Sequence, residues 1–250
     1  MRRFYLPPDL VPTLEQDTFI LKGQEARHMA QVLRLCAGDE VEFFDGSGRV
    51  MHARLQTVKQ GHISLAIIER RRESAPAYPP LTLALAQLKG NKMDLVVQKA
   101  NELGVHSFLP LVTKFCEKRG GGEAAGARWQ RIVIESCKQC KRTIPMQIGS
   151  AQPVPHLTAS DFSWATLRLV AWEDEQQAGL PLAAIDANTG PVCLLIGPEG
   201  GLHRDELAWL REQGFQSFSL GSHVLRAETA AIAAVAIIQH LCGALQPQIR

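Results

Sequence analysis

A glycine-rich segment near the carboxyl end of the chain has the residue types of a ligand-binding loop. The apolar residues 192–196 run directly into Gly-Pro-Glu-Gly-Gly at 197–201. Such a run is typical of a buried strand that ends in a turn. In open α/β sheets ligands bind at the carboxyl ends of strands, and glycine lets the backbone approach them closely. The segment therefore predicts a binding loop, and the alternative is a turn with a structural role alone. Its glycine spacing differs from the dinucleotide fingerprint.

A second loop places two charges next to an apolar segment. Arg226 and Glu228 stand directly before the almost wholly apolar residues 229–241, which predict a helix. Charges at such a junction indicate a functional site. The alternative is that Glu228 stabilises the amino terminus of the helix through its negative charge.

Cys137 and Cys140 have the C-x-x-C spacing of some metal and redox sites. The chain has no second C-x-x-C, and the nearest following histidine is His156. Structural zinc sites need four ligands, so this pair lacks partners. We therefore predict no metal.

The elements that position the two loops follow an α/β pattern. Strand, helix and strand signals succeed one another from residue 81, with apolar positions at helical spacing within 93–103. Such alternation predicts a parallel sheet covered by helices. Further strands are expected at 105–111, 167–172, 192–196 and 215–220, and further helices at 203–213 and 229–241.

The first 72 residues have a different pattern. Short apolar or alternating runs are separated by turn residues, with Asp-Gly-Ser-Gly at 45–48 as a hairpin signal and one predicted helix at 25–35. This predicts a small β-barrel. The proline-rich residues 73–80 resemble an interdomain linker, so we place the domain boundary near residue 73.

Composition excludes several classes of protein. The chain has 250 residues, 46% of them hydrophobic, and six cysteines, too few for a disulfide scaffold. Its longest apolar stretch, 230–238, is far shorter than the roughly 20 residues of a membrane-spanning helix. We expect a cytoplasmic protein. Residues 73–150 carry 11 basic and 6 acidic side chains, and this excess of positive charge favours binding to nucleic acid. The alternative is a basic helix face that is only solvated.

Several of these segments, in this order, resemble one enzyme family. Leu-Leu-Ile-Gly-Pro-Glu-Gly-Gly at 194–201, Leu-Gly at 220–221 and Val-Leu-Arg-Ala-Glu-Thr-Ala at 224–230 are similar to the RsmE family. These are ribosomal RNA uridine-N3 methyltransferases of the SPOUT class. Cys-Lys-Gln-Cys-Lys-Arg at 137–142 also matches, and the resemblance covers the whole chain. Two positions depart from the family pattern: Ala227 replaces a threonine, and residues 113–115 are Thr-Lys-Phe.

The resemblance implies the architecture and the partners. Residues 1–72 would form a PUA-like RNA-binding β-barrel, and residues 73–250 an α/β SPOUT methyltransferase domain with a C-terminal trefoil knot. The cofactor would be S-adenosyl-L-methionine and the protein a homodimer. Its substrate would be 16S ribosomal RNA or the small ribosomal subunit, with no membrane or metal involved.

Specific residues are expected to carry these functions. The catalytic candidates are Arg226, Glu199 and Glu228. The predicted cofactor residues, which would use main-chain groups and apolar walls, are Leu195, Ile196, Gly197, Gly201, Leu220, Gly221, Leu225, Arg226, Ala227, Glu228, Thr229 and Ala230. The predicted RNA-binding residues are Arg2, Arg3, Arg34, Arg49, Lys92, Lys99 and Arg142.

The chemistry suggests a role for Arg226. Uridine N3 carries a proton, so the site must remove it or stabilise the resulting anion. We expect Arg226 to stabilise negative charge on the uracil oxygens, while Glu199 or Glu228 orients the loops. The alternative is that Arg226 binds phosphate or forms an internal ion pair. Two other functions stay open: methylation of another RNA position such as a ribose 2′-oxygen, and non-catalytic RNA binding in ribosome assembly.

Overall fold

The chain divides into two compact units. The computed structural model describes residues 1–59, 61–74, 76–116, 122–172, 182 and 185–246. The first unit comprises Met1–Ala75 together with Cys137–Ile144, and the second comprises Pro76–Ser136 and Pro145–Arg250. The sequence places a single boundary near residue 73, whereas the structure also groups a short later segment, 137–144, with the first unit.

The first unit is built on a five-stranded sheet. Its strands lie in the order β1-β3-β4-β5-β2, with β1 parallel to β3 and the other pairs antiparallel. Phe4, Phe43 and Leu65 are buried in its core, as expected for a β-rich domain. The bounds are β1 Arg2–Tyr5, β2 Thr18–Lys22, β3 Glu40–Phe44, β4 Arg49–Lys59 and β5 His62–Arg72, with a 3-10 turn η1 at Pro8–Leu10.

The helix predicted at 25–35 is shorter and less regular than expected. The α-helix α1 spans only Gln24–Arg27 and continues as a π-helical turn, η2, over His28–Val32. The backbone N–H of Leu33 donates to the carbonyl of His28, at 3.0 Å. Arg34 then has a φ of 52°, which right-handed helices cannot contain. Sequence spacing cannot detect this change of hydrogen-bond pattern.

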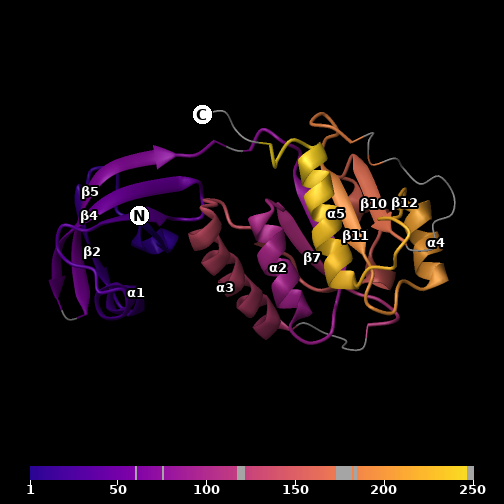
Figure 1. Ribbon diagram of the computed structural model, residues 1–250, viewed down its shortest axis with the longest axis horizontal. Helices are drawn as coiled ribbons and strands as arrows, with labels where there is room; N and C mark the ends of the chain where they lie inside the picture. Colours follow the sequence, from indigo (N-terminus) through magenta and orange to yellow (C-terminus); the bar gives the residue numbers. More distant parts are fainter. Residues whose placement is uncertain (60, 75, 117–121, 173–181, 183–184, 247–250) are drawn as a thin grey trace. The chain divides into compact units, whose positions relative to one another are not determined.

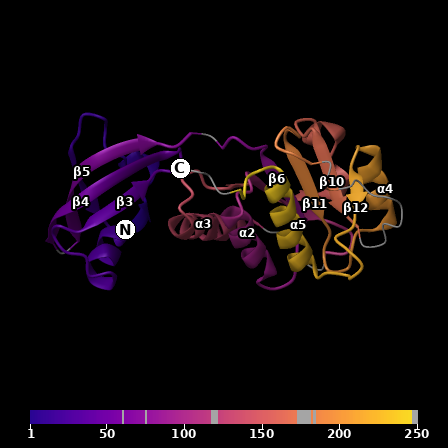
Figure 2. The ribbon, with the colours of Figure 1, turned by 45° about the horizontal axis from the view of Figure 1, so that its top comes forward.

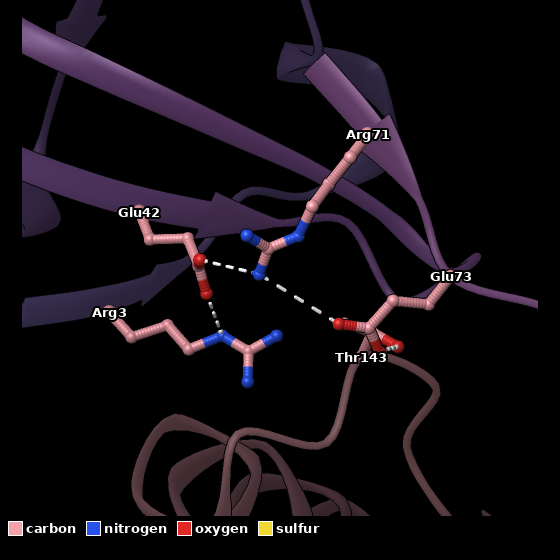
Figure 3. A network of polar contacts seen from close by, with 5 residues as sticks. All are labelled: Arg3, Glu42, Arg71, Glu73 and Thr143. Atoms are coloured by element: carbon pink, nitrogen blue, oxygen red, sulfur yellow. Dashed lines mark hydrogen bonds and ion pairs between the residues drawn. The ribbon is translucent and has the colours of Figure 1, made fainter. Parts of the chain in front are cut away.

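A network of charged and polar side chains, of which Arg3 and Glu42 are buried, lies where the segment 137–144 meets the strands of the first unit (Figure 3). Glu42 forms an ion pair with Arg3 Nε at 2.9 Å and accepts a hydrogen bond from Arg71 Nη2 at 2.8 Å. The Thr143 hydroxyl donates to Glu73 Oε2 at 2.7 Å, and Arg71 approaches Glu73 Oε1 at 3.9 Å. The network ties residue 143 to the strands of the first unit, although these positions are far apart in sequence.

The second unit contains a parallel sheet, which confirms the α/β prediction. The main strand order is β12-β10-β11-β6-β7-β8, and β9 also pairs with β7. All residues of β6 and β11 are buried, as expected for central strands covered on both faces. The strands are β6 Leu81–Ala86, β7 Ser107–Val112, β8 Gln147–Ile148, β9 Gln152–Pro153, β10 Leu167–Ala171, β11 Val192–Ile196 and β12 Gln216–Phe218.

Helices cover the two faces of this sheet. α2 and α5 lie side by side and α5 packs on β6 and β11 (Figures 1 and 2). Leu207 and Leu210 of α4 join a separate core cluster with Cys193 and Leu195 of β11. The bounds are α2 Lys92–Glu102, α3 Glu123–Cys140, α4 Arg204–Glu212 and α5 Ala227–Leu241, with 3-10 turns η3 at Val154–His156 and η4 at Ala159–Phe162. In the described ranges, no helix is long and apolar enough to cross a membrane.

Helix α3 was not predicted as an element. Trp129, Val133 and Cys137 are buried at spacings of four residues, so the pattern of one apolar helix face was present. The glycines before and within its first turn obscure that pattern, since glycine weakens helices. Its exposed face carries Arg128 and Arg131.

Candidate functional site

A cavity of about 300 Å³ opens where three neighbouring strands of the second unit end. Strands β11, β10 and β12 are adjacent and parallel, so their carboxyl ends reach the same edge of the sheet. Each strand contributes the loop that follows it. The lining residues are Ala171, Trp172, Ile196, Gly197, Pro198, Glu199, Gly201, Leu202, Phe218, Ser219, Leu220, Gly221, Ser222, His223, Val224, Leu225, Arg226, Ala227 and Ala230.

Two glycines are required by the shape of this cavity. A Cβ on Gly197 would lie 3.1 Å from Leu202 Cγ, so a side chain there would push the loop apart. Gly221 has a φ of +126°, a conformation that L residues rarely adopt. The backbone conformation of both loops therefore depends on glycine at these two positions.

Nine of the predicted cofactor residues line the cavity. They are Ile196, Gly197, Gly201, Leu220, Gly221, Leu225, Arg226, Ala227 and Ala230. The other three do not line it. Leu195 is fully buried on the sheet face that packs against α4, Thr229 is exposed, and Glu228 contacts Lys92 instead.

The end of β10 was missed as part of the site. Ala171 and Trp172 line the cavity, and the sequence had identified strand 167–172 without assigning it a binding role. The strand-end rule applies to this segment as it does to β11 and β12. The segment lacks glycine, the residue type that indicated a binding loop after β11 and β12, so the sequence did not predict a binding role for it.

Three chain segments meet at the ammonium group of Lys92. Lys92, the first residue of α2, contacts Glu199 Oε1 at 3.0 Å and Glu228 Oε2 at 3.4 Å. The backbone N–H of Lys89 also donates to Glu199 Oε1, at 3.0 Å. Two predicted catalytic carboxylates are thus brought together by a lysine that the sequence had assigned to RNA binding.

The charges in this cluster stabilise one another. Burial alone would raise the pKa of the Glu199 carboxyl, but hydrogen bonds from backbone N–H groups and from Lys92 lower it overall. The hydrogen bond and ion pair with Glu199, together with Glu228, raise the pKa of the Lys92 ammonium despite partial desolvation. The carboxylate of Glu199 and the ammonium of Lys92 therefore each favour the charged form of the other.

Arg226 occupies a different position from the two glutamates. It is the N-cap residue of α5, its side chain is exposed, and it lines the cavity. Among the described residues its guanidinium has no hydrogen-bond or ion-pair partner. It can therefore offer its N–H groups to a ligand, and the alternative of an internal ion pair finds no partner in the described ranges.

Lys114 and Phe115, which depart from the family pattern, contact the glycine loop and the start of α4. Phe115 packs against Gly200, where a Cβ would lie 3.2 Å from Phe115 Cβ, and its ring meets the His203 ring edge-on at 5.7 Å. The Lys114 ammonium donates to His203 Nε2 at 3.0 Å. His203 is also the N-cap residue of α4. These residues support the glycine loop from the side of β7.

The predicted RNA-binding residues are divided between the two units. Arg2, Arg34 and Arg49 are exposed in the first unit, and Arg49 pairs with Asp45 at 2.6 Å. Arg3 lies in the same unit but is only 9% exposed, with its guanidinium 4.7 Å from the Phe44 ring. A buried side chain of this kind is not available as a surface contact for phosphate.

The remaining basic candidates have local partners. Arg142 Nε donates to the carbonyl of Ile144 at 2.6 Å within the first unit. Lys99 pairs with Glu102 at 2.8 Å on α2.

Cys137 is buried and Cys140 exposed, and neither is in a disulfide. Over the described residues, no group of three or more His, Cys, Asp or Glu side chains is arranged to hold a metal ion.

Fold and site together define a class of protein: an α/β enzyme domain that binds a ligand at glycine-containing loops after parallel strands, joined to a small β-rich domain. Residues 76–239 match the family model of the RNA methyltransferase domain, and residues 21–68 match that of the RNA methyltransferase PUA domain. The chain belongs to this RNA methyltransferase family. The predicted fold class, a methyltransferase domain preceded by a PUA domain, is confirmed.

Relatives match over nearly their full length. Ribosomal RNA small subunit methyltransferase E of Rickettsia conorii is 31% identical over 89% of both chains, and that of Bacillus subtilis is 28% identical over 96% of both. The crystal structure of ribosomal RNA small subunit methyltransferase E from Neisseria gonorrhoeae bound to S-adenosyl methionine has a TM-score of 0.81 and 30% identity. It covers 96% of this chain and 98% of that one. The resemblance to the RsmE family is thus confirmed.

Proposed function

We propose that this protein transfers the methyl group of S-adenosyl-L-methionine to N3 of one uridine in 16S ribosomal RNA, in the cytoplasm. Methylation of small-subunit ribosomal RNA is the activity that the names of its relatives carry. The observation that carries the proposal is the cavity at three strand ends, which brings together two glycine-containing loops, the cation Arg226 and the carboxylate Glu199. N3 is the atom that the family resemblance assigns.

The cavity fits the cofactor. Its walls combine apolar side chains such as Leu202, Phe218 and Leu225 with main chain that lines the cavity at Gly197 and Gly221. An adenosine needs these two features, flat apolar surfaces for the base and backbone donors and acceptors for its polar edge. The bound cofactor supplies an electrophilic methyl group on a sulfonium.

Arg226 supplies the electrostatic part of the reaction. Methylation forms a bond from N3 to the methyl carbon as the carbon–sulfur bond breaks and leaves a neutral thioether, and the N3 proton passes to solvent water. Removal of that proton places negative charge on the two uracil carbonyl oxygens. The Arg226 guanidinium at the edge of the cavity can donate to an oxygen and stabilise this charge. Because N3 lies on the pairing edge, the uridine must be unpaired when it reacts.

We assign RNA contacts to the exposed basic residues of the PUA-like unit. Arg2, Arg34 and Arg49 are accessible, and phosphate contacts from such residues set affinity and register without reading bases. Arg3, being buried, supports that surface through Glu42 and Arg71 instead. Arg142, which also belongs to the first unit, and Lys99 of α2 complete the set.

The protein acts as a homodimer in this proposal. Helix α5 is apolar from Ala230 to Ile238, yet Ile237 remains 39% exposed, and Leu95 of α2 is 43% exposed. Thr229, Ala233 and Ile237 follow one another at intervals of four residues and so share one face of α5. A helix that is apolar all round is normally buried, and a second copy of the chain would cover this face.

Mass mapping of ribosomal RNA tests the proposed reaction. A strain lacking the protein should lose one N3-methyluridine from 16S RNA, and the purified protein with S-adenosyl-L-methionine should restore it. A missing 2′-O-methyl group would support the second functional class instead. An unchanged modification profile, with RNA binding retained, would support a non-catalytic assembly factor.

A further inference from the structure

Lys92 links three segments of the second unit that are distant in sequence. Its ammonium contacts Glu199, which follows β11 and lines the cavity, and Glu228 in the first turn of α5. Lys92 is the first residue of α2 and directly follows the turn that contains Lys89. The backbone N–H of Lys89 also donates to Glu199. Glu228 lies two residues after Arg226. Lys92 therefore connects the glycine loop to the helix start that carries the proposed catalytic cation.

Electrostatics makes this connection strong. The Glu228 side chain is 14% exposed, and its Oε2 is buried with no hydrogen-bond partner among the residues described. A buried carboxylate without compensation is costly, and Lys92 supplies the opposite charge at 3.4 Å. If the ammonium were removed, Glu199 and Glu228 would face each other across the space it fills, and their repulsion would separate the two loops.

We propose that Lys92 is a positioning residue for methyl transfer, which holds the glycine loop through Glu199 and the Arg226-bearing start of α5 through Glu228 in one fixed arrangement. The inference rests on the proposed function and extends it to a residue outside the cavity lining. It differs from the sequence prediction that Lys92 binds RNA phosphate, because the ammonium is already engaged by two carboxylates.

The central experiment compares Lys92→Met with Lys92→Arg in the full chain. Methyl transfer from labelled S-adenosyl-L-methionine to small-subunit ribosomal RNA gives kcat and the KM for RNA, and calorimetry gives the Kd for the cofactor. We expect Lys92→Met to lower kcat about 100-fold, the size of effect that a small misplacement of reacting groups produces. The KM for RNA should stay within about twofold, and Lys92→Arg should recover at least part of kcat because it restores the charge. Arg204→Met, which removes an exposed cation from the start of α4, is the matched control and should leave kcat unchanged.

A charge-compensated double variant separates positioning from simple packing. Lys92→Met combined with Glu228→Gln removes the repulsion that the single variant creates. It should have a higher kcat than Lys92→Met alone, although Glu228→Gln by itself lowers kcat. Hydrogen exchange without RNA adds a second readout: amides of 197–201 and 226–230 should exchange faster in Lys92→Met and return towards the wild-type rate in the double variant.

Three other outcomes overturn the inference. If Lys92→Met raises the KM for RNA and weakens its salt dependence while kcat is kept, Lys92 is a phosphate contact. If kcat and exchange rates are those of wild type, or if the double variant is no better than the single one, Lys92 does not position the loops. If Lys92→Met fails to fold, Lys92→Arg and the double variant decide. The proposed function fails separately, when wild-type protein places its methyl group on another atom; the exchange measurements still test Lys92.

Discussion

Arg226 is the residue whose chemistry most directly determines the proposed reaction. It lines the cavity at the N-cap of α5, and its guanidinium has no partner among the described residues. Lysine would keep the positive charge but lose the planar, forked set of donors that can bind an oxygen in a fixed direction. The difference between the two side chains is therefore a test of geometry and not of charge alone.

We expect Arg226→Lys to lower kcat by about 100-fold, the cost of removing one well-placed donor to a developing oxyanion. The Kd for S-adenosyl-L-methionine and the affinity for RNA should change less than about threefold. Single-turnover methylation, calorimetry and RNA filter binding measure the three quantities. Arg34→Ala provides the contrast: it should weaken RNA binding and reduce the salt slope by about 1, with the single-turnover rate at saturating RNA unchanged. A loss of RNA affinity in Arg226→Lys, with the rate kept, would assign Arg226 to phosphate binding.

Residues differ in how far sequence could predict their roles. Gly197, Gly221 and Arg226 could be identified because each lies next to a strand or helix end that is itself visible in the sequence. Lys92 could not, since Glu199 lies 107 residues away and only the folded sheet brings them together. Arg3 was misleading for a similar reason: its burial depends on Glu42 and Phe44, which sequence does not place beside it.

The hairpin between β3 and β4 shows how one element is stabilised by its turn. Asp45 is 3% exposed and accepts hydrogen bonds from the Ser47 backbone and hydroxyl at 2.8 Å and from Arg49 Nε at 2.6 Å. Gly46 and Gly48 have φ values of 83° and 91°, which fit the predicted Asp-Gly-Ser-Gly turn. Burial would raise the pKa of the Asp45 carboxyl, but the bonds from Ser47 and Arg49 lower it overall.

The lowered pKa of Asp45 makes the stability of the first unit pH-dependent. A carboxyl with a folded pKa below the unfolded value of about 3.9 stabilises the fold above that pH, and the contribution is lost as pH falls through the folded pKa. We expect Asp45→Asn to lower the free energy of unfolding by about 1–3 kcal/mol at pH 7, and by less near pH 2. Urea unfolding followed by far-ultraviolet circular dichroism at both pH values measures the free energy of unfolding. Asp9→Asn, at an exposed position, should have no such effect, and an equal loss for Asp45→Asn at both pH values would contradict the explanation.

Elements with a strong apolar pattern were predictable, and irregular ones were not. Strands β6 and β11 and helices α2, α4 and α5 appear close to their predicted positions, because their periodicity is set by burial. The π-helical turn after α1 depends on a hydrogen-bond register that composition does not encode. Helix α3 was not predicted because glycines interrupt its amino-terminal end, although its buried residues have helical spacing.

At the scale of the whole molecule, the proposed dimer makes a direct prediction. Ile237→Asp places a charge on the exposed apolar face of α5, and burial of an unpaired carboxylate in an interface is strongly unfavourable. We expect wild-type protein to sediment as a dimer and Ile237→Asp as a folded monomer. Val32→Asp, which changes a side chain 68% exposed in the first unit, should remain dimeric. A dimeric Ile237→Asp would show that this face is not the interface.

The segment 137–144 is the feature of the whole molecule that sequence could least predict. Its first residues, 137–140, are the end of α3, so their position in the sequence assigns them to the methyltransferase domain. The hydrogen bond of Thr143 to Glu73 and the ion pair of Lys138 with Glu25, at 3.3 Å, place them in the first unit. These contacts span 70 and 113 residues, separations at which no local pattern carries information.

This arrangement has a consequence for the order of synthesis on the ribosome. The strands of the first unit are complete once residue 72 has been made, and a domain of that kind usually folds before the next one emerges. Here the unit still lacks 137–144, so the contacts of Glu73 with Thr143 and of Glu25 with Lys138 cannot form until β6, α2 and β7 have also been translated. The amino-terminal unit therefore finishes its assembly only after more than half of the chain exists, and a nascent chain halted at residue 100 would hold an unfinished barrel.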